Sequence, residues 1–532
     1  MMTSAFDRLI TTLLESKMVT TPLAALIGHA QARPDAVAFI QDREGWTYSR
    51  LAAESARLAR GMLARGIKKG DRVVLHMANV PELVLAYYAC FRIGAIAVPL
   101  NTRLQSTELA ALLRRLKPAL YIGQLDFYGR VANFDAAVLP YEGRFVVGGP
   151  IRAVTDRMAQ RWTALFGDAT SDPIAVKPDP QAPAVLLSTA GATGEAKLVV
   201  HTQESLATAA ATFRELGFDA DQIGIAALPM VHASGLFIFL AAIHCGMPLV
   251  LFERFKADPV LDAIEHYHCS TLPLLPWMFA ALLERQQAQP RKMSSLRTCL
   301  SGGDICPAHL QNLFPHYFGV PLRSFWQATE AAGSTLYGLQ SGPVCRIRQE
   351  AEFRLVDDSG APVVRGAVGE LLLRGAHVAS GYWAGPEDLV PVDNDGWFHT
   401  GDLMRQGEAD ELWFVGRKKD IIVRDGAKIA PVEVEHALIA HPAVQEAAVV
   451  GVPDMILGQR VVGFVKLMPD TDDIGLEAIR TSLLARVADY KTPEALLIID
   501  EIPRNAHGKV DRQRLIAMAA GYDEVELVAA SR

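Results

Sequence analysis

The segment from Leu187 to Thr202, LSTAGATGEAKLVVHT, combines residue types and spacings that favour phosphate binding. Gly191 and Gly194 allow backbone N–H groups to converge on an anion without an intervening Cβ. Thr193 and Lys197 add a hydroxyl and an ammonium, which make charge-assisted contacts to phosphate. The common P-loop pattern G-x-x-x-x-G-K-[ST] does not match this segment. A purely structural Gly-rich turn therefore stays open as an alternative.

The elements that must position this loop are two strands, predicted by the apolar runs 184–187 and 198–200. Residues 36–123, which precede these strands, alternate between strand-like and helix-like patterns. The expected strands there are 36–41, 71–79, 95–101 and 119–123, and the expected helices are 48–63, 81–93 and 107–116. Strands separated by helices of this length indicate βαβ units and a mainly parallel sheet. Residues 124–180 support no prediction beyond a mixed connecting region.

The alternation of strands and helices continues after residue 200, and two segments with different patterns follow it. The expected strands are 223–229, 248–253, 270–276, 296–303 and 321–329, and the expected helices are 204–216, 234–243, 259–267, 276–285 and 307–314. Short antiparallel strands at 352–364, 369–375 and 411–416 predict a smaller β-rich subdomain. A compact α+β unit follows, with helices at 431–440, 476–490 and from 510, and strands at 447–453, 460–468 and 495–500. The predicted fold class is α/β.

The bulk composition is that of an ordinary globular enzyme. The chain has 532 residues, of which 50% are hydrophobic and 21% charged, and its net charge is -7. At roughly 150 residues per domain, this length predicts three or four folding units. The negative charge gives no reason to expect a nucleic-acid partner.

The cysteines and the N-terminal residues indicate the cellular compartment in which we expect the protein. Six cysteines are scattered without a C-x-x-C pair, which argues for free thiols in a reducing compartment. Charged residues interrupt the apolar residues of the first segment, so we expect no signal peptide. The longest strongly apolar run, 236–243, is too short to span a bilayer. We expect a cytoplasmic protein without a membrane span.

Downstream of the loop, nine further motifs occur in a fixed order. They are LPMVHASG (228–235), SGGDICP (301–307), WQATE (326–330), GELLLRG (369–375), GYW (381–383), WFHTGDL (397–403), GRKKDIIVRDGAKIAPVEVE (416–435), ADYKTPE (488–494) and PRNAHGKVDR (503–512). Together the motifs resemble the adenylate-forming superfamily, which includes acyl- and aryl-CoA synthetases, carrier-protein adenylation domains and beetle luciferases. The resemblance covers about residues 20 to 520.

The resemblance implies a fold and a reaction. The N-terminal domain, residues 1–418, would bind nucleotide and acid on βαβ-type sheets, and a small mobile α+β domain, residues 419–532, would carry a catalytic lysine. A carboxylate would attack the α-phosphate of ATP to give an acyl-adenylate and pyrophosphate. The small domain would then rotate, and a thiol would take the acyl group. The implied cofactors and partners are ATP, Mg²⁺, a small carboxylic acid and coenzyme A, and the implied oligomeric state is monomer or homodimer.

The resemblance also implies nucleotide-binding residues. The phosphate loop, with Thr189, Gly191, Thr193, Gly194 and Lys197, would hold the β- and γ-phosphates, with Thr193 also near the metal. Glu330 would hold Mg²⁺, because a hard cation on phosphate oxygens favours a carboxylate. The remaining implied contacts are Thr329 to the α-phosphate, Gly302, Gly303 and Asp304 around the adenine, Trp326 stacked on the base, Asp402 in a tight turn accepting from both ribose hydroxyls, and Arg417.

The chemistry itself is assigned to Lys509. An ammonium between the carboxylate and the α-phosphate stabilises the charge that builds there in the transition state. His232 would lie beside the reacting carboxylate, Lys419 would occupy the interdomain hinge, and Gly426 would line the thiol tunnel. The acid pocket would be formed by His232, Gly235, Gln327 and Ala328. Because Gln327 stands where the family commonly has glycine, we expect a short or compact acid.

Departures from the family pattern leave alternatives open. Ala190 and Ala192 replace the usual hydroxyl residues, and Ala196 and Leu198 replace the usual Pro and Gly. Each lost hydroxyl–phosphate bond costs roughly 1.5–3 kcal/mol. A stand-alone adenylation enzyme that loads the phosphopantetheine of a carrier protein is the nearest alternative to an acid–CoA ligase. A catalytically weakened relative comes next, and a luciferase-like oxygenase has the least support. The identity of the acid is not readable from the sequence.

Overall fold

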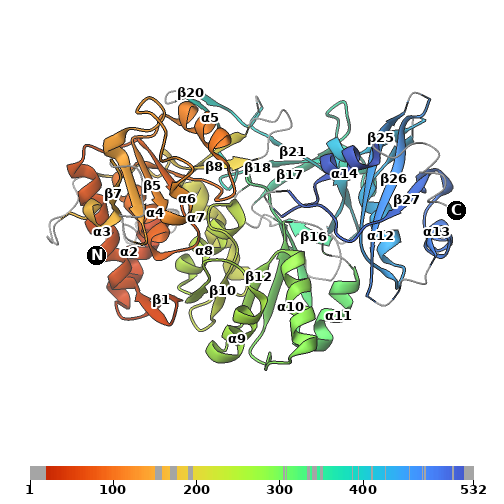
Figure 1. The fold of residues 1–532 in the computed structure, drawn as a ribbon, viewed down its shortest axis with the longest axis horizontal. Coiled ribbons are helices and arrows are strands. Elements are labelled where there is room, and N and C mark those ends of the chain that lie inside the picture. Colours follow the sequence, from red (N-terminus) through yellow and green to blue (C-terminus); the bar gives the residue numbers. More distant parts are fainter. Residues whose placement is uncertain are drawn as a thin grey trace, which may run out of the picture.

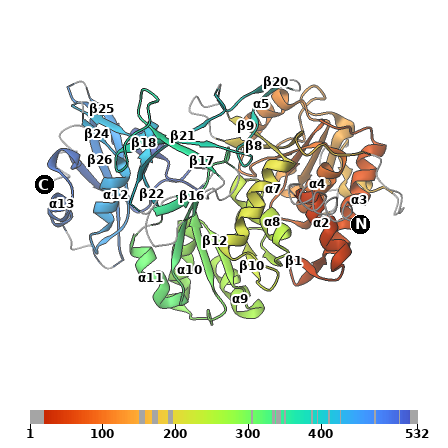
Figure 2. The same cartoon turned by 180° about the vertical axis from the view of Figure 1, so that it is seen from behind.

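A computed structural model describes most of the chain. The described residues are 20–149, 158–167, 176–189, 196–303, 306, 308–331, 336–337, 344–347, 351–385, 388–393, 395–408, 411–425, 427–454, 456–469, 471, 475–505 and 508–520. Figures 1 and 2 show the N-terminal helices at one end of the molecule and the C-terminal unit at the other, with the segments coloured yellow and green between them.

The first large sheet has nine strands and carries the phosphate loop. Across the sheet these are β20 (Asp388–Val390), β19 (Gly381–Gly385), β9 (Lys197–Thr202), β8 (Pro183–Thr189), β4 (Ile96–Pro99), β3 (Arg72–His76), β5 (Leu120–Gln124), β6 (Arg144–Val147) and β7 (Gln160–Arg161). Strands from β8 to β7 pair in parallel, as the βαβ pattern predicted. β8 and β9, which flank residues 190–195, pair antiparallel, so the two predicted strands are confirmed, whereas the predicted loop lies outside the described residues.

The second large sheet has thirteen strands and combines parallel with antiparallel pairing. In order they are β17 (Glu352–Val356), β18 (Val368–Arg374), β21 (Phe398–Gln406), β22 (Glu411–Arg417), β16 (Val344–Ile347), β15 (Leu336–Tyr337), β14 (Leu322–Trp326), β13 (Thr298–Gly302), β12 (Thr271–Leu274), β10 (Gly224–Ala226), β11 (Leu249–Leu251), β1 (Val37–Gln41) and β2 (Glu44–Thr47). The pairing is parallel from β1 to β14 and antiparallel from β14 to β17. The β-rich region thus contributes strands to this sheet and, through β19 and β20, to the first one.

The helices of the large domain pack on these sheets, and their ends follow local sequence signals. They are α2 (Pro22–Ala32), α3 (Tyr48–Ala64), α4 (Pro81–Ile93), α5 (Ser106–Leu116), α6 (Leu125–Tyr128), α7 (Gln203–Thr212), α8 (Ala233–Cys245), α9 (Ala257–Tyr267), α10 (Pro276–Ala288) and α11 (Ala308–Phe318), with 3₁₀ turns η1 (Tyr141–Gly143), η3 (Trp162–Leu165) and η4 (Phe213–Leu216). In α4, Pro81 occupies the first turn and Gly94 ends the helix at φ +68°, positions that suit proline and glycine. α8 is almost wholly apolar and buried, and its side chains join residues of both sheets in one core cluster.

The C-terminal unit has its own core. A three-stranded sheet of β25 (Val444–Asp454), β26 (Gly458–Leu467) and β27 (Ala495–Ile498) and a hairpin of β23 (Ile422–Arg424) and β24 (Ala427–Ile429) pack with α12 (Pro431–Ile439), α13 (Leu476–Leu484) and α14 (Arg512–Ala520). The 3₁₀ turns here are η5 (Lys418–Asp420) and η6 (Asp489–Lys491). The helix expected at 476–490 ends at Leu484, because the chain turns at Ala485 and continues as η6. Within the described residues, none of the helices combines the length and apolarity that a membrane crossing requires.

Candidate active site

The WQATE segment follows β14 at the carboxyl end of the parallel strands, the edge where ligands bind in open α/β sheets. Its last residue, Glu330, is mostly buried, and burial raises the pKa of its carboxyl group. The Tyr382 hydroxyl donates to Glu330 Oε1 at 3.2 Å. This bond and the charges of Lys197 and Arg417 oppose the rise. Glu330 is therefore a mostly buried carboxylate that a cation would stabilise further.

Tyr382 joins the two sides of the phosphate site. It lies on β19, which pairs with β9, and its ring is 4.7 Å from Lys197 Nζ. One aromatic side chain thus contacts both the loop lysine and the carboxylate at position 330. Tyr382 falls inside the GYW motif, but its function was not predicted from the sequence.

Several predicted phosphate and nucleotide residues lie outside the described residues. They are Gly191, Thr193, Gly194 and Asp304, together with the substituted positions Ala190 and Ala192; Gly426, predicted to line the thiol tunnel, also lies outside them. Thr189 is described and ends β8. Of the two departures that flank Lys197, Leu198 is buried in the core, and the Ala196 carbonyl accepts a hydrogen bond from Arg115 at 2.8 Å.

Gly302 and Gly303 leave no room for a side chain. A Cβ at Gly302 would lie 2.6 Å from Phe325 Cδ1, and one at Gly303 would lie 2.7 Å from Leu275 Cδ2. Gly303 also has φ +81°, in the left-handed region that favours glycine. The end of β13 must therefore be bare backbone.

Trp326, Asp402 and Arg417 meet in one cluster. Trp326 Nε1 donates to Asp402 Oδ2 at 2.7 Å, and Arg417 Nε lies 3.2 Å from Oδ1. Asp402 is only 4% exposed. Burial raises its pKa, while Arg417, the Trp326 hydrogen bond and Lys509 act in the opposite direction. Stacking of Trp326 on adenine stays a prediction, whereas its bond to Asp402 was not foreseen.

The tight turn expected around Asp402 is wrong. Residues 400–402 lie inside the nine-residue strand β21, and Asp402 pairs with Arg417 of β22. Gly401 has φ +70°, so the strand is distorted at this point without reversing its direction.

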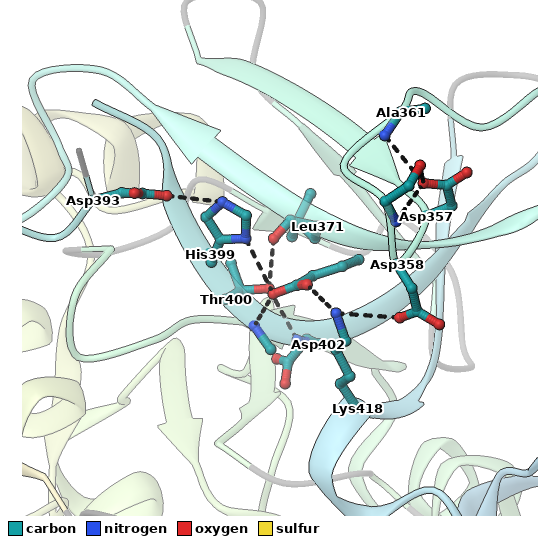
Figure 3. A network of polar contacts seen from close by, with 12 residues as sticks. Asp357, Asp358, Ala361, Leu371, Asp393, His399, Thr400, Asp402 and Lys418 are labelled. Carbon is teal, nitrogen blue, oxygen red and sulfur yellow. Dashed lines mark hydrogen bonds and ion pairs between the residues drawn. The ribbon is translucent and has the colours of Figure 1, made fainter. Parts of the chain in front are cut away.

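Figure 3 shows the contacts that hold this distorted segment. Gly401 N–H donates to Glu370 Oε1 at 3.2 Å, the Thr400 hydroxyl donates to the Leu371 carbonyl at 2.8 Å, and Asp402 N–H donates to Thr400 Oγ1 at 3.0 Å. Glu370 is 7% exposed and accepts from Lys418 Nζ at 3.0 Å. A buried carboxylate thus connects the segment that carries Asp402 with the first residue of η5. Glu370 lies in the GELLLRG motif, but its contacts depend on the pairing of β18 with β21 and on the position of η5, which the motif does not contain.

His201 contacts the backbone of the WQATE segment. It is fully buried, and burial lowers its pKa to about 4. The ring is therefore neutral near pH 7, and its Nε2 lies 2.7 Å from the Thr329 carbonyl oxygen while Nδ1 lies 3.1 Å from Ser205 Oγ. Because a carbonyl accepts only, Nε2 carries the proton. His201 thus fixes the backbone at Thr329, one residue before Glu330.

Lys509 lies in a short turn of the C-terminal unit. Its N–H donates to Asn505 Oδ1 at 3.2 Å, and its carbonyl accepts from Asn505 N–H at 2.8 Å. The neighbouring Gly508 has φ +80°, and a Cβ there would lie 3.2 Å from Trp277 Nε1 of α10. The turn is therefore packed against the large domain, where the charge of Lys509 acts on Asp402. Lys419 is exposed in η5, between the two units.

A pocket lies next to the end of β14, and its lining differs from the residues predicted to form the acid pocket. Its walls come from α8 (Ser234 and Ile238), from the ends of β12 and β13 (Leu274 and Leu300), and from Phe325 and Gln327. Gln327 lines this pocket, whereas His232, Gly235 and Ala328 are not among its lining residues, and the composition of the acid pocket stays a prediction.

Each of the other three has a different environment. Gly235 does not line the pocket, because it lets α8 approach the Pro229 backbone, where a Cβ would be 2.3 Å from the carbonyl oxygen. Ala328 packs with Trp326 against the cluster around Leu371, since alternate residues of an extended segment face opposite sides. His232 lies at the N-cap of α8, where its side chain makes no capping bond.

Comparison with protein families gives two matches in this chain. The AMP-binding enzyme family matches residues 27–383, and the AMP-binding enzyme C-terminal domain matches residues 433–509. Together they account for most of the chain.

Individual relatives cover nearly the whole chain. The chain is 32% identical over 505 residues to the indoleacetate–CoA ligase of Aromatoleum aromaticum, covering 92% of this chain and 97% of the relative. It is 31% identical over 501 residues to the medium-chain fatty-acid–CoA ligase of Escherichia coli, covering 91% and 88%.

Solved structures agree in fold. The o-succinylbenzoate CoA synthetase of Bacillus subtilis, in complex with its acyl-adenylate intermediate, superimposes with a TM-score of 0.77 at 27% identity, covering 92% of this chain and 97% of that one. The same synthetase in complex with ATP and magnesium gives a TM-score of 0.76 at 26% identity, covering 92% and 98%.

Proposed function

This chain belongs to the AMP-binding enzyme family and is an AMP-forming acid–CoA ligase, and from that premise we propose that its substrate is a compact carboxylic acid. In the first half-reaction, a carboxylate oxygen of the acid attacks the α-phosphorus of ATP, and the bond to pyrophosphate breaks. In the second, the CoA sulfur attacks the acyl carbon, the thiol proton is lost, and the bond to AMP breaks. The products are acyl-CoA, AMP and pyrophosphate.

The described residues fit the assigned nucleotide and metal. Asp402, with its buried oxygens facing Trp326 and Arg417, would bind the ribose, because a carboxylate offers acceptors on both oxygens. Glu330 would hold Mg²⁺, which neutralises charge on the phosphates. Its raised pKa and its position beside Lys197 and Tyr382 support this assignment.

The position of the Lys509 turn supports its assignment to the first half-reaction. Gly508 contacts Trp277 of the large domain, and Lys509 acts electrostatically on Asp402. In this arrangement the ammonium would stabilise the charge that develops between the acid and the α-phosphate. The C-terminal unit, which we begin at residue 419, would then rotate about η5 to admit CoA.

The wall of the pocket carries the proposal of a compact acid. Phe325 and Gln327 occupy this wall on the side of β14. The side chain at position 327 fills space that a glycine would leave open to a longer acyl chain. The proposed acid therefore has one aromatic ring or a short chain, not a chain of sixteen carbons. A cytoplasmic location and a monomeric or homodimeric state are part of the same proposal.

A panel of acids tests this proposal. Pyrophosphate release and acyl-CoA formation should both depend on the acid, with kcat/KM highest for benzoate-sized or short-chain acids and falling by at least about tenfold for chains beyond the pocket. Gln327→Gly should gain activity on longer acids and lose some on the shortest. Preference of the wild type for a sixteen-carbon acid would contradict the proposal.

A further inference from the structure

The pocket that would receive the acid has a wall of uneven polarity. Among the described residues that line it, Ser234 and Gln327 are the ones with polar side chains, and the rest are apolar or glycine. Gln327 follows the end of β14, two residues after Phe325, and both side chains face the pocket. A polar amide therefore projects into a mainly apolar space.

The amide of Gln327 has no partner among the described residues. Its Oε1 is buried and makes no hydrogen bond. Other buried glutamines keep at least one bond from the amide: Gln286 Nε2 donates to the Arg291 carbonyl at 2.7 Å, and Gln311 Nε2 donates to the Cys306 carbonyl at 2.8 Å. Gln41 and Gln203 also have a buried Oε1 without a partner, but their Nε2 atoms donate to the Asn79 and Phe91 carbonyls at 2.8 and 3.1 Å. An unpaired buried amide is destabilising, and the amide of Gln327 lies where the substrate would lie.

We propose that Gln327 selects an acid that carries a hydrogen-bond donor, such as a hydroxyl, amino or ring N–H group, at a distance from its reacting carboxylate. The inference rests on the proposed function and adds the polarity of the acid to its size. The buried Oε1 is an acceptor, so it pairs with a donor. The remaining apolar wall contacts an aromatic or short aliphatic body.

The same wall disfavours a second acidic group. None of the described lining residues carries a charge, and an unpaired carboxylate or sulfonate is costly to bury in apolar surroundings. The selected acid is thus monoanionic, with a neutral donor. This separates it chemically from diacids of the same size.

Matched pairs of acids test the inference. The probes are 4-hydroxybenzoate against 4-methylbenzoate, 3-hydroxybenzoate against 3-methylbenzoate, and 6-hydroxyhexanoate against heptanoate, with acid-dependent pyrophosphate release as the readout. A site built to pair with a polar group discriminates strongly against analogues that lack it. In at least one pair, we expect wild-type kcat/KM to favour the donor-bearing acid by about tenfold or more.

Two variants assign the preference to a residue. Gln327→Met keeps a similar length without the amide, so the preference should disappear or reverse while activity on the methyl-bearing acid is kept. Ser234→Ala removes the other polar lining group and should keep the wild-type preference. Wild-type ratios within twofold of one in every pair, or an unchanged ratio in Gln327→Met, would overturn the inference. If Gln327→Met does not fold, the wild-type ratios alone decide.

The same data separate the two proposals. If small acids are activated and long chains rejected without any preference for a donor, the compact-acid proposal holds and the inference about Gln327 fails. If long-chain acids are preferred over every small acid, the proposed function itself fails.

Discussion

At the scale of single residues, the site depends on two buried carboxylates held by different neighbours. Glu330 is contacted by Tyr382, and Asp402 by Trp326 and Arg417. Burial raises both pKa values, and positive groups or hydrogen-bond donors oppose the rise. Both carboxylates are therefore stabilised further when a metal ion or ribose hydroxyls approach.

The bond from Trp326 to Asp402 predicts a specific effect of Trp326→Phe. The variant keeps an aromatic ring but removes the indole N–H, so the pKa of Asp402 rises further. Because ribose binding requires the carboxylate, KM for ATP should increase about tenfold, and the acid limb of kcat/KM for ATP should move to higher pH.

Initial rates across the acid range check this prediction. Trp413→Phe on the neighbouring strand β22 is the matched control and should leave both quantities unchanged. An acid limb at the wild-type pH in Trp326→Phe would show that the indole N–H does not stabilise the Asp402 carboxylate.

The motifs predicted which residues lie together here, but they did not predict the contacts between those residues. Glu330, Asp402 and Lys509 were located by their sequence surroundings, and the structure places them in one region. The bond between Trp326 and Asp402 joins residues 76 positions apart, and that between His201 and Thr329 joins residues 128 apart. Such pairs depend on strand order and register, which no local pattern contains.

At the scale of elements, η5 and its ionic contacts lie where the chain passes between the two units. Lys418 Nζ lies 3.0 Å from Glu370 Oε2 and 3.3 Å from Asp358 Oδ1, and Lys428 Nζ lies 2.7 Å from Asp358 Oδ2. Asp358 and Lys428 are well exposed, and exposed ion pairs contribute little stability. These contacts can therefore break when the C-terminal unit turns.

The hinge assignment predicts the behaviour of Lys419→Pro. Proline fixes φ near −65° and removes an N–H, so η5 should lose the freedom to rotate. The variant should form acyl-adenylate at a rate near that of the wild type but accumulate it instead of acyl-CoA. Quench-flow separation of the two products measures this. Lys419→Ala should turn over normally, and normal turnover in Lys419→Pro would place the hinge elsewhere.

Elements with strong periodicity were predicted well. The helix expected at 81–93 is α4, and those expected at 234–243 and 276–285 lie within α8 and α10. The errors occurred where conformation depends on one residue or on distant pairing. The resemblance implied a tight turn at Asp402, and Gly401 does have φ +70°, but pairing of β21 with β18 and β22 keeps the segment a strand.

At the scale of the whole molecule, the two units have separate cores. The two apolar clusters of the C-terminal unit contain only residues between Ile422 and Ala519. Ile422 and Ile429 of the β23–β24 hairpin are almost completely buried in one of these clusters. This hairpin precedes the family match that begins at residue 433, so its burial is consistent with a boundary at residue 419, which stays a prediction.

Two fragments test that boundary. Residues 419–532 should unfold cooperatively in denaturant, as an independent domain does. Residues 433–532 lack the two buried isoleucines, which contribute about 1.5–3 kcal/mol each, and should be less stable or unfolded. Circular dichroism during urea titration measures both. Equal stability of the two fragments, or no transition in the longer one, would contradict a domain that begins at 419.

The assignment of Lys509 to adenylation alone is the central claim, and the two half-reactions of Lys509→Ala test it most directly. Acid-dependent pyrophosphate release should fall by about 100- to 1,000-fold or more, because a fixed cation stabilises the developing charge. Conversion of a supplied acyl-adenylate and CoA to acyl-CoA should stay close to the wild-type rate, since the lysine turn leaves the site before that step. Equal loss of both half-reactions, or wild-type pyrophosphate release, would contradict the account.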